Sequence, residues 1–539
     1  MQTTLQALNQ RAAHVLPRML TQVCRDPNSP LHGSWDRNWW HYKIRDFSSI
    51  ILQQGGYAMH QAVGLPNGIA PQTEFLHNLA LSSAVFWNQR ACSHGAFEEY
   101  YPYEQGYPPL AFSTLAMAKL VNEGVVPLNI IQKGLKYASE QLLSRFEPQA
   151  ANQQIAGTAA VAMIYKVAPE LVDKTRFDKL LDRSFDLQHQ DGWFPEYDGP
   201  DLGYLTVTMD CLWDLHDATG DPRCLNAIIK SMEFVNWFIA SPPHHAGMHN
   251  SRNTDYLVPY AIARLTTEDT PVRSSATRVL KQLYECAAEP DHFFAAIDDR
   301  YWCHYIGHSL FRAIHILQDA SLPANSSTPQ PVNEHLTTFQ AHTGHVRLFS
   351  DSSTALVSAH KGGIVTATWE NGAEANDYGW IIKRDTKQWV SHWWSTDWTV
   401  ETSGQQLTIC GPMVSHREHL SSPWKHMLLR VASFTLGRRL IGILKRLLIF
   451  KQGSTEITLE RRIHFDQDTL VIRDQITGLK SIDQVLRAPR ASKRHVASAD
   501  SYHPQDASRL GGGASFSVES QSKDGLLTVE TRYQPRSKY

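Results

Sequence analysis

The chain changes its hydrophobic period near residue 325, and this change constrains the fold more than any other feature. Between about residues 70 and 320, apolar residues recur at spacings of three and four, which is typical of helices joined by short loops. Residues 321–335, SLPANSSTPQPVNEH, contain three prolines and cannot continue a helix. β-branched runs with a period of two follow. We therefore predict a helical domain over 1–320, a linker over 321–335 and an antiparallel β domain over 336–539.

Sixteen segments carry these two patterns most clearly. The helical pattern is clearest in 75–87, 111–121, 130–146, 155–167, 171–187, 205–215, 225–238 and 256–265. The strand pattern is clearest in 345–348, 355–357, 364–369, 380–382, 407–409, 456–459, 470–472 and 527–531. No strict repeat is visible, so we expect a closed or irregular array of helical hairpins and not a regular solenoid.

Composition excludes several classes of function. The 539 residues contain 51 Lys and Arg against 53 Asp and Glu, so the net charge of −2 supplies no general attraction for nucleic acid. Seven cysteines without a C-x-x-C pair indicate reduced thiols and neither a disulfide framework nor a zinc site. We expect no cofactor and no metal at the site, and the sequence leaves a structural divalent metal open. The first twenty residues lack a signal-peptide pattern, and the chain lacks an apolar run of eighteen residues, so we expect a cytoplasmic protein.

The segment 424–451 differs from its surroundings in charge. It contains seven Lys and Arg and no acidic residue, interleaved with leucine, isoleucine and phenylalanine. This composition predicts an amphipathic basic helix that contacts an anionic surface, such as the inner membrane, or a partner protein. The alternative is a pair of strands or a short packed helix with solvated cations.

Four loop-rich stretches concentrate tyrosine, histidine, arginine and carboxylate side chains: 87–109, 190–204, 244–256 and 301–308. Aromatic faces stack on sugar rings and charged groups bind hydroxyls and carboxylates, so these residue types suit a carbohydrate cleft. The alternative is that each aromatic cluster belongs to the core. His304 and His308 are four residues apart, as metal ligands on a helix can be, but no third ligand stands out. The candidate substrate-binding residues are Arg90, His94, Glu99, Tyr103, Trp193, Glu196, Tyr197 and Tyr256.

One stretch resembles a known family. The run Gln190-Asp191-Gly192-Trp193-Phe194-x-Glu196-x-x-Gly199-Pro200-x-x-x-Tyr204, ahead of a proline-rich joint and a β half, is similar to the heparinase II/III-like and alginate-lyase-like polysaccharide lyases. The resemblance covers about residues 150–260 by motif. It implies an incomplete (α/α) toroid followed by an antiparallel β-sandwich, with substrate between them. Asn152 and Tyr204 stand where that family places a catalytic Asn and Tyr. Gln153 replaces a frequent His, and 358–363 matches the family's H-x-H-x-D stretch poorly.

The resemblance implies β-elimination of a uronate-containing poly- or oligosaccharide. The reaction removes the proton at C5, so the neighbouring carboxylate must be neutralised, a task that suits Asn152 with Arg252. Tyr204 is the candidate for proton transfer, with His249 as its partner and His360 as a candidate from the β domain.

Three other functions remain open at this point. A glycoside hydrolase would use acids from the set Glu98, Glu99, Glu196, Asp198 and Asp201. A terpene-type cyclase would need an acidic cluster, for which Asp298 and Asp299 are the available pair. A noncatalytic carbohydrate-binding protein of exopolysaccharide assembly would need only the cleft.

Overall fold

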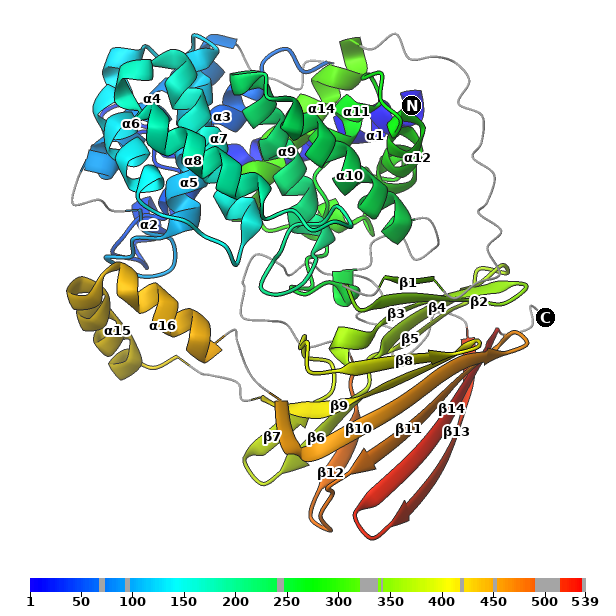
Figure 1. Ribbon diagram of the computed structural model, residues 1–539. Coiled ribbons are helices and arrows are strands. Elements are labelled where there is room, and N and C mark those ends of the chain that lie inside the picture. The colour runs from blue at the N-terminus through cyan, green and yellow to red at the C-terminus, as the bar shows by residue number, and fades with distance from the viewer. Residues whose placement is uncertain are drawn as a thin grey trace.

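A computed structural model describes residues 1–66, 73–92, 97–239, 247–319, 338–340, 343–416, 421–448, 453–489 and 514–535. The predicted linker 321–335 and His94 lie outside these ranges. Figure 1 shows the helical half above, the sheets below, and a separate pair of helices beside the sheets.

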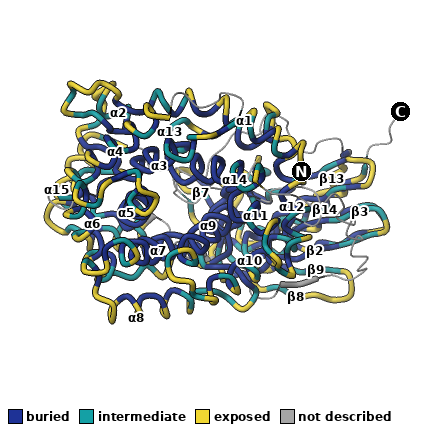
Figure 2. The backbone as a smooth tube through the Cα atoms, turned by 90° about the horizontal axis from the view of Figure 1, so that it is seen from above, coloured by how far each residue is buried: buried dark blue, intermediate teal, exposed yellow. Residues whose placement is uncertain are grey.

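Six helices contact one another in a ring at the centre of the helical half. They are α3 (Gln54–Gln61), α5 (Tyr107–Asn122), α7 (Ala151–Val167), α9 (Leu202–Thr219), α11 (Tyr260–Leu265) and α14 (Gly307–Asp319). Each contacts the next, and α14 contacts α3. Nearly every residue of α5, α7 and α9 is buried (Figure 2), as expected for helices that are apolar or small-residue-rich on all sides.

An outer helix packs against each inner one. These are α1 (Gln2–Leu20), α4 (Thr73–Cys92), α6 (Leu128–Leu143), α8 (Lys174–Phe185), α10 (Pro222–Ile239) and α12 (Arg273–Tyr284). The pairs are α3 with α4, α5 with α6, α7 with α8, α9 with α10, α11 with α12, and α14 with α1. The outer helix α8 is amphipathic and buries Phe177, Leu180, Leu181 and Ser184 on one face. Short helical segments complete this half: α2 (Arg37–Trp40), α13 (Asp299–Tyr301), η1 (Ile50–Gln53), η2 (Pro169–Leu171), η3 (Gly247–His249), η4 (Phe293–Ala296) and the π-turn η5 (Trp302–Ile306).

The C-terminal half contains two antiparallel sheets. The first has the order β1 (Thr338–Gln340), β2 (His345–Phe349), β3 (Ser353–Ser358), β4 (Ile364–Trp369), β5 (Glu374–Asp377). The second has the order β12 (Gln484–Arg487), β6 (Trp380–Arg384), β7 (Lys387–Val390), β9 (Gln406–His416), β10 (Gly453–Asp466), β11 (Thr469–Thr477), β14 (Leu526–Pro535), β13 (Ala514–Lys523), and β8 (Thr399–Ser403) pairs with β9. Alternate side chains of both sheets, such as Val346 and Ile409, share one hydrophobic core.

A helical hairpin is inserted between β9 and β10. It consists of α15 (Pro423–Leu436) and α16 (Arg438–Leu448), and it lies against the helical half (Figure 1). Arg430 forms an ion pair with Asp46, and Ser433 Oγ donates a hydrogen bond of 2.8 Å to the carbonyl oxygen of Pro102. Residues 423–448 form helices, so the alternative of a pair of strands is wrong for this segment. The amphipathic helix at a membrane or partner and the short packed helix both stay predictions.

The two halves meet through polar contacts. His345 Nε2 lies 2.9 Å from the carbonyl oxygen of His249, and Arg347 Nη2 donates to the carbonyl oxygen of Phe238 at 3.0 Å. Trp394 Nε1 donates to the carbonyl oxygen of Asp198 at 3.3 Å, so the β half also contacts the turn that carries the sequence motif.

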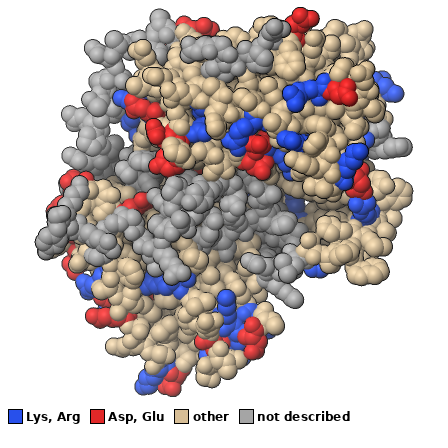
Figure 3. Space-filling view, turned by 180° about the vertical axis from the view of Figure 1, so that it is seen from behind, with Lys and Arg blue, Asp and Glu red and all other residues tan. Residues whose placement is uncertain are grey.

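The structure confirms a helical N-terminal half and an antiparallel β C-terminal half, whereas the finer names, an incomplete toroid and a sandwich, stay predictions. The helix predicted over 256–265 begins only at Tyr260, and the one predicted over 171–187 is divided between η2 and α8. Within the described ranges, no helix combines the length and apolar character needed to cross a bilayer. In Figure 3, acidic and basic side chains intermix on the face seen from behind.

Candidate active site

A cavity of about 830 Å³ lies between the inner helices and the α15–α16 hairpin. The side chains of chemical interest on its wall are Glu99, Tyr100, Tyr101, Glu104, Tyr107, Arg145, Asn152, Gln153, Tyr197, Tyr204, Arg252, His304, Tyr305, Arg438 and Lys445. Its size suits a short stretch of a sugar chain.

Asn152 is held in place by a buried carboxyl group. It lies in the first turn of α7, where Glu196 Oε1 accepts hydrogen bonds from its backbone N–H at 3.0 Å and from Nδ2 at 2.5 Å. Glu196 therefore acts as the cap that α7 lacks at its own N-terminus. Burial raises the pKa of Glu196 to about 8, although the nearby Arg252 and the hydrogen bonds from Asn152 oppose the shift. Among the described residues, Glu196 is the only acceptor of Nδ2, so the second amide hydrogen is available to a ligand.

Tyr204 is positioned by the N-terminal cap of α9. Asp201 Oδ1 accepts the backbone N–H of Tyr204 at 3.1 Å, and Asp201 Oδ2 accepts the backbone N–H groups of Arg252 and Thr254, both at 3.3 Å. One carboxylate thus ties the start of α9 to the loop that carries Arg252. Gly203 is required at this contact, because a Cβ there would lie 2.2 Å from the Thr254 methyl carbon.

Arg252 joins the parts of the site electrostatically. Its guanidinium carbon lies 4.5 Å from the ring centroid of Tyr204 and 4.6 Å from that of Tyr197, and Nη1 lies 3.4 Å from Glu196 Oε2. Burial lowers the pKa of Arg252, but the negative charges available from Tyr204, Tyr197, Glu196 and Asp201 outweigh burial and raise it. Arg252 is therefore a fixed cation over the rings of Tyr204 and Tyr197.

The loops of the site contain strained backbone. Tyr197 and Asp198 have φ angles of 52° and 72°, and Asn253 has 57°, in the left-handed region that residues other than glycine seldom adopt. Such residues cluster where the surrounding structure must hold a functional geometry. Here they turn Tyr197 and Arg252 towards the same cavity.

A π-turn adds His304 and Tyr305 to the wall. His304 departs from helical geometry within η5, a feature that is frequent at functional sites. Burial and the charge of Arg300 lower the pKa of His304 to about 3, so the ring is neutral at physiological pH. The hydroxyl oxygens of Tyr305 and Tyr256 are 2.8 Å apart.

Two carboxyl groups lie on another side of the cavity. Burial, together with the charge of Glu104, raises the pKa of Glu99 to about 8. Burial raises the pKa of Glu104 to about 7, against the effect of hydrogen bonds from the backbone N–H groups of Glu99 at 2.9 Å and Tyr100 at 2.7 Å. Glu99 thus carries a proton at neutral pH.

Cations line the side of the cavity nearest the hairpin. Arg438 and Lys445 come from α16 and Arg145 from the helical half. Lys445 Nζ lies 2.6 Å from Glu147 and 5.3 Å from the Tyr197 ring centroid. Arg145 donates to the carbonyl oxygen of Gln105 at 2.9 Å, which fixes its position.

Five residues predicted from the sequence meet at this cavity, and two more support it. Asn152, Tyr204, Arg252, Glu99 and Tyr197 line the wall. Glu196 supports Asn152, and Tyr256 supports Tyr305.

The histidines predicted as proton-transfer partners lie elsewhere. Both ring nitrogens of His249 face hydroxyls of the β half, 2.9 Å from Ser358 Oγ and 2.8 Å from Thr366 Oγ1. Burial, with the neighbouring His345 and Lys361, places the pKa of His249 well below its usual value. His360 packs edge-on against Trp394 in the β half. The structure therefore corrects the expectation that either lies beside Tyr204.

Three predicted substrate-binding residues also lie away from the cavity wall. Arg90 forms an ion pair with Glu98 and lies over the Trp39 ring. Trp193 is part of the core and stacks on His189. Tyr103 is exposed and contacts Phe434 of α15. These residues hold loops together, which is the core role that aromatic clusters usually have.

The residues that sequence reasoning missed are Tyr100, Tyr101, Glu104, Tyr107, Arg145, Gln153, Tyr305, Arg438 and Lys445, together with the cavity position of His304. Most belong to or adjoin the stretches 87–109 and 301–308, so their composition was a usable signal. Arg438 and Lys445 carried no such signal, because only the docking of the hairpin brings them to the cavity.

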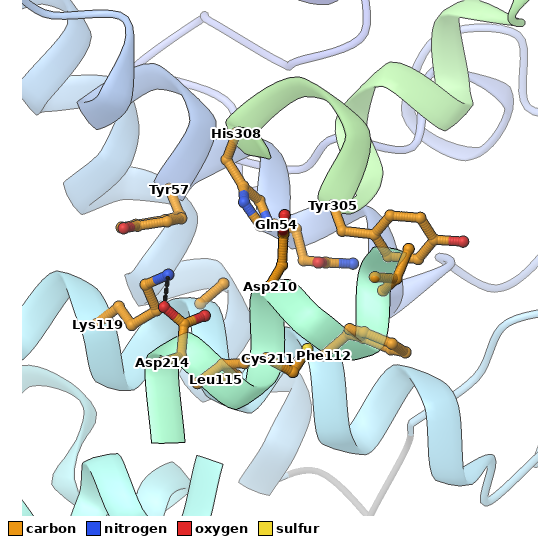
Figure 4. Close-up of a pocket in the computed structure, with 12 residues that line it drawn as sticks. Gln54, Tyr57, Phe112, Leu115, Lys119, Asp210, Cys211, Asp214, Tyr305 and His308 are labelled. Carbon is orange, nitrogen blue, oxygen red and sulfur yellow. Dashed lines mark hydrogen bonds and ion pairs between the residues drawn. The ribbon is translucent and has the colours of Figure 1, made fainter. Parts of the chain in front are cut away.

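A second, much smaller cavity has Tyr305, Asp210 and Asp214 on its wall (Figure 4). Its volume of about 10 Å³ suits a single water molecule at most. Asp214 Oδ1 on its wall accepts from Lys119 Nζ at 2.8 Å and from Arg312 Nη2 at 2.7 Å. Burial raises the pKa of Asp210, also on the wall, to about 6. This cluster stabilises the ring of inner helices and has no room for a substrate.

Two other predictions about acidic and metal sites can be compared with the structure. Asp299 forms an ion pair of 2.6 Å with Arg18, away from the cavity wall, which gives no support to the cyclase alternative. Across the described part of the chain, no group of three or more His, Cys, Asp or Glu is arranged to hold a metal ion.

Comparisons with known proteins give little beyond a general likeness. No family model matches the sequence, and no curated protein matches it. A mutant of chondroitin AC lyase from Streptomyces coelicolor A3 is similar, with a TM-score of 0.45, 12% identity, and coverage of 97% of this chain and 76% of that chain. A chondroitinase AC lyase solved with oligosaccharides has a TM-score of 0.41, 9% identity, and coverage of 99% and 82%. At such low scores, these similarities carry no conclusion about the activity of this chain.

Proposed function

We propose that the protein cleaves a uronate-containing poly- or oligosaccharide by β-elimination in the cavity of about 830 Å³. The observation that carries the proposal is the convergence of Asn152, Tyr204 and Arg252 on one wall, with the Arg252 guanidinium carbon 4.5 Å from the Tyr204 ring centroid. These groups match the requirements of the reaction one by one.

The first requirement is neutralisation of the substrate carboxylate. The proton at C5 becomes acidic only when the negative charge that develops on the neighbouring carboxylate is stabilised. Asn152 offers its second amide hydrogen for this purpose, and Glu196 fixes the direction of the amide before substrate arrives. A donor fixed in advance costs no reorganisation in the transition state.

The second requirement is a base for the C5 proton. A tyrosine hydroxyl has a pKa near 10 and needs a cation to act as a base at neutral pH. Arg252 supplies a permanent charge over the Tyr204 ring, which favours the phenolate. Tyr204 takes the proton from C5, the C4–O4 bond breaks, a C4–C5 double bond forms, and a proton must reach O4.

The third requirement is a donor for O4. Tyr204 can pass the proton that it has taken to O4. When the C5 proton and O4 lie on the same side of the sugar ring, one side chain can act first as the base and then as the acid. His304 is the other group in reach of the cavity. With its pKa lowered to about 3, the ring is not protonated at physiological pH and cannot serve as the acid, so we assign the donation to Tyr204 and a hydrogen-bonding role to His304.

The substrate class follows from the charge of the wall. Arg145, Arg438 and Lys445 place three cationic side chains on the side nearest the hairpin, and Tyr197 offers a ring face beside Lys445. Repeated carboxylates along a chain would bind these cations, and sugar rings would stack on the aromatic side chains. We therefore infer an anionic sugar chain.

We also infer the finer architecture. The ring of contacts from α3 through α14 and back, each inner helix with an outer partner, supports an (α/α) toroid for the helical half. The core shared by the two antiparallel sheets supports a sandwich for the β half. In this arrangement the cavity lies at the end of the toroid that the hairpin covers.

A glycoside hydrolase is the second candidate, and one observation favours it. Glu99 lines the cavity with a pKa of about 8, so it holds a proton at neutral pH, as the general acid of a glycosidase must. Glu104 would then be the second carboxyl group, although its hydrogen bonds to backbone N–H groups indicate a structural role.

The experiment is incubation with a panel of uronate polymers, including alginate, heparan and chondroitin types. Elimination creates a 4,5-unsaturated sugar that absorbs in the ultraviolet, whereas hydrolysis creates reducing ends without that absorbance. We expect ultraviolet absorbance with the wild type, loss of it in Tyr204→Phe, and retention in the matched control Tyr165→Phe, which changes a half-buried tyrosine outside the cavity. Reducing ends without ultraviolet absorbance would favour the hydrolase. The absence of both signals on every polymer would favour a protein that binds carbohydrate without cleaving it.

A further inference from the structure

We propose that the outer face of the α15–α16 hairpin binds peripherally to an anionic phospholipid membrane. The inference concerns a surface outside the cavity and does not depend on the proposed activity.

The first observation is that α15 exposes its larger apolar side chains. Trp424, Leu428 and Phe434 are 73%, 70% and 72% exposed, and Met427 and Val431 lie on the same stripe. Spacings of three, four, seven and ten residues from Trp424 place all five on one face of the helix. A helix in a water-soluble fold normally turns such a face to the core.

The opposite face of α15 is the one that packs on the protein. Ser433 is buried and donates to the carbonyl oxygen of Pro102, and Leu429 reaches the cavity wall. The helix is thus anchored by its smaller and more polar side, which leaves the apolar stripe facing outward.

The second observation is the charge of the hairpin. Residues 423–448 contain six basic residues and no acidic one. Arg438 and Lys445 line the cavity and Arg430 pairs with Asp46, which leaves Lys425, Arg439 and Arg446 for the outer face. On α16, Arg439 and Arg446 alternate with Ile443 and Leu447 on one exposed face. Helices that lie in the headgroup region of a membrane have this combination of an apolar stripe with flanking Lys and Arg.

The third observation is a segment far away in sequence that extends the surface. The ion pair between Arg430 and Asp46 holds the loop 41–46 beside α15. This loop presents Tyr42 and Ile44, which are 55% and 72% exposed, with Lys43 between them. A second segment therefore adds exposed aromatic, aliphatic and basic side chains next to α15.

Charge complementarity indicates that the partner of this surface is an anionic membrane. A surface with basic side chains and no acidic residue in the hairpin itself is attracted to the negative surface of an anionic leaflet, and each Lys or Arg near such a surface adds to the binding. The apolar stripe supplies the insertion that charge alone does not provide. An anionic bilayer meets both features at once.

Co-sedimentation of the full chain with vesicles tests the proposal. We expect binding to vesicles of phosphatidylcholine with phosphatidylglycerol, weak binding to phosphatidylcholine alone, and release as salt is raised. The variant with Arg439→Glu and Arg446→Glu should bind the anionic vesicles at least about thirtyfold more weakly, from about a fivefold loss for each of the two cations removed. Neither residue lines the cavity.

Two further variants separate the contributions of charge and apolar surface. Trp424→Ser with Leu428→Ser keeps the charge and removes part of the stripe, and it should also lose binding. The matched control, Arg176→Glu with Lys179→Glu on the exposed side of α8, changes the net charge by the same amount and should bind as the wild type does. Thermal melts of all variants report on folding.

Three results would overturn the proposal, two from vesicle binding and one from sedimentation without lipid. The first is wild-type protein that stays in the supernatant with anionic vesicles, and the second is a hairpin variant, folded as judged by its melt, that binds as well as the wild type. Sedimentation velocity without lipid identifies the other occupant: a wild-type dimer that the Trp424 and Leu428 variant converts to monomer would assign this face to a second copy of the chain, and so would contradict the membrane assignment.

Discussion

Replacement of Glu196 by glutamine tests how the site orients Asn152. Burial raises the pKa of Glu196 from 4.5 to about 8, so the folded protein holds this proton more tightly than the unfolded chain does. The stabilisation that results is fully present below pH 4.5 and is lost as the pH rises through about 8. Glutamine cannot titrate and keeps an oxygen for both N–H groups of Asn152.

The magnitude follows from the pH range. Between the unfolded and folded pKa values of Glu196, each rise of one pH unit lowers the free energy of unfolding by about 1.4 kcal/mol. The wild type should therefore lose about 2–3 kcal/mol more stability than the Glu196→Gln variant between about pH 6 and pH 8.5. Urea unfolding at both pH values measures this difference, and contributions from Glu99 and Glu104 cancel because both proteins contain them. Equal losses in the two proteins would refute the reasoning and would mean that Glu196 is ionised in the folded state at neutral pH.

Three further predictions follow from the cavity and the buried ion pairs. Asn152→Ala should lower kcat by about 10²–10³ with a smaller change in KM, because it removes a donor that acts on developing charge; steady-state kinetics would contradict this by showing a change in KM alone. Asp214→Asn should reduce the free energy of unfolding by about 3–5 kcal/mol, since it leaves two buried cations unpaired, whereas the exposed control Asp182→Asn should cost less than about 1 kcal/mol in the same urea titration. Arg438→Ala and Lys445→Ala should each raise KM about tenfold for an anionic substrate and leave kcat nearly unchanged; equal effects on a neutral sugar chain would exclude charge recognition.

Local patterns predicted the classes of structure well. The three-and-four spacing marked every inner and outer helix from α4 to α11, and the period of two marked strands in both sheets. The local patterns could not show which helices form the inner ring, because that depends on contacts between distant segments. In hindsight, the small and apolar residues on all sides of α7 explain why this helix is an inner one.

The candidate site was predictable where residues lie close to the motif. Asn152, Tyr204 and Arg252 meet because Glu196 and Asp201, both within the motif, bind the starts of α7 and α9 and the loop 250–254. The contacts from Glu196 to Asn152 and from Asp201 to Arg252 span 44 and 51 residues of sequence, but both start from this one turn.

The rest of the site depends on contacts that sequence spacing does not reveal. His249 is three residues from Arg252, yet the η3 turn directs its ring to hydroxyls of the β half. His304 reaches the cavity through a π-turn that interrupts the helical period. Arg438 and Lys445 reach it because a hairpin inserted between two strands packs on the other half of the molecule.

The most direct test of the central claim is the fate of water during cleavage. Elimination breaks the C4–O4 bond without adding water, so the masses of the two products sum to the mass of the substrate, and no oxygen from the solvent enters either one. Mass spectrometry of products formed in water labelled with heavy oxygen measures this, with short reaction times to limit exchange at the reducing end. We predict unlabelled products, one of which carries the double bond. Products that together contain one added water, with labelled oxygen, would contradict the account and assign the cavity to hydrolysis.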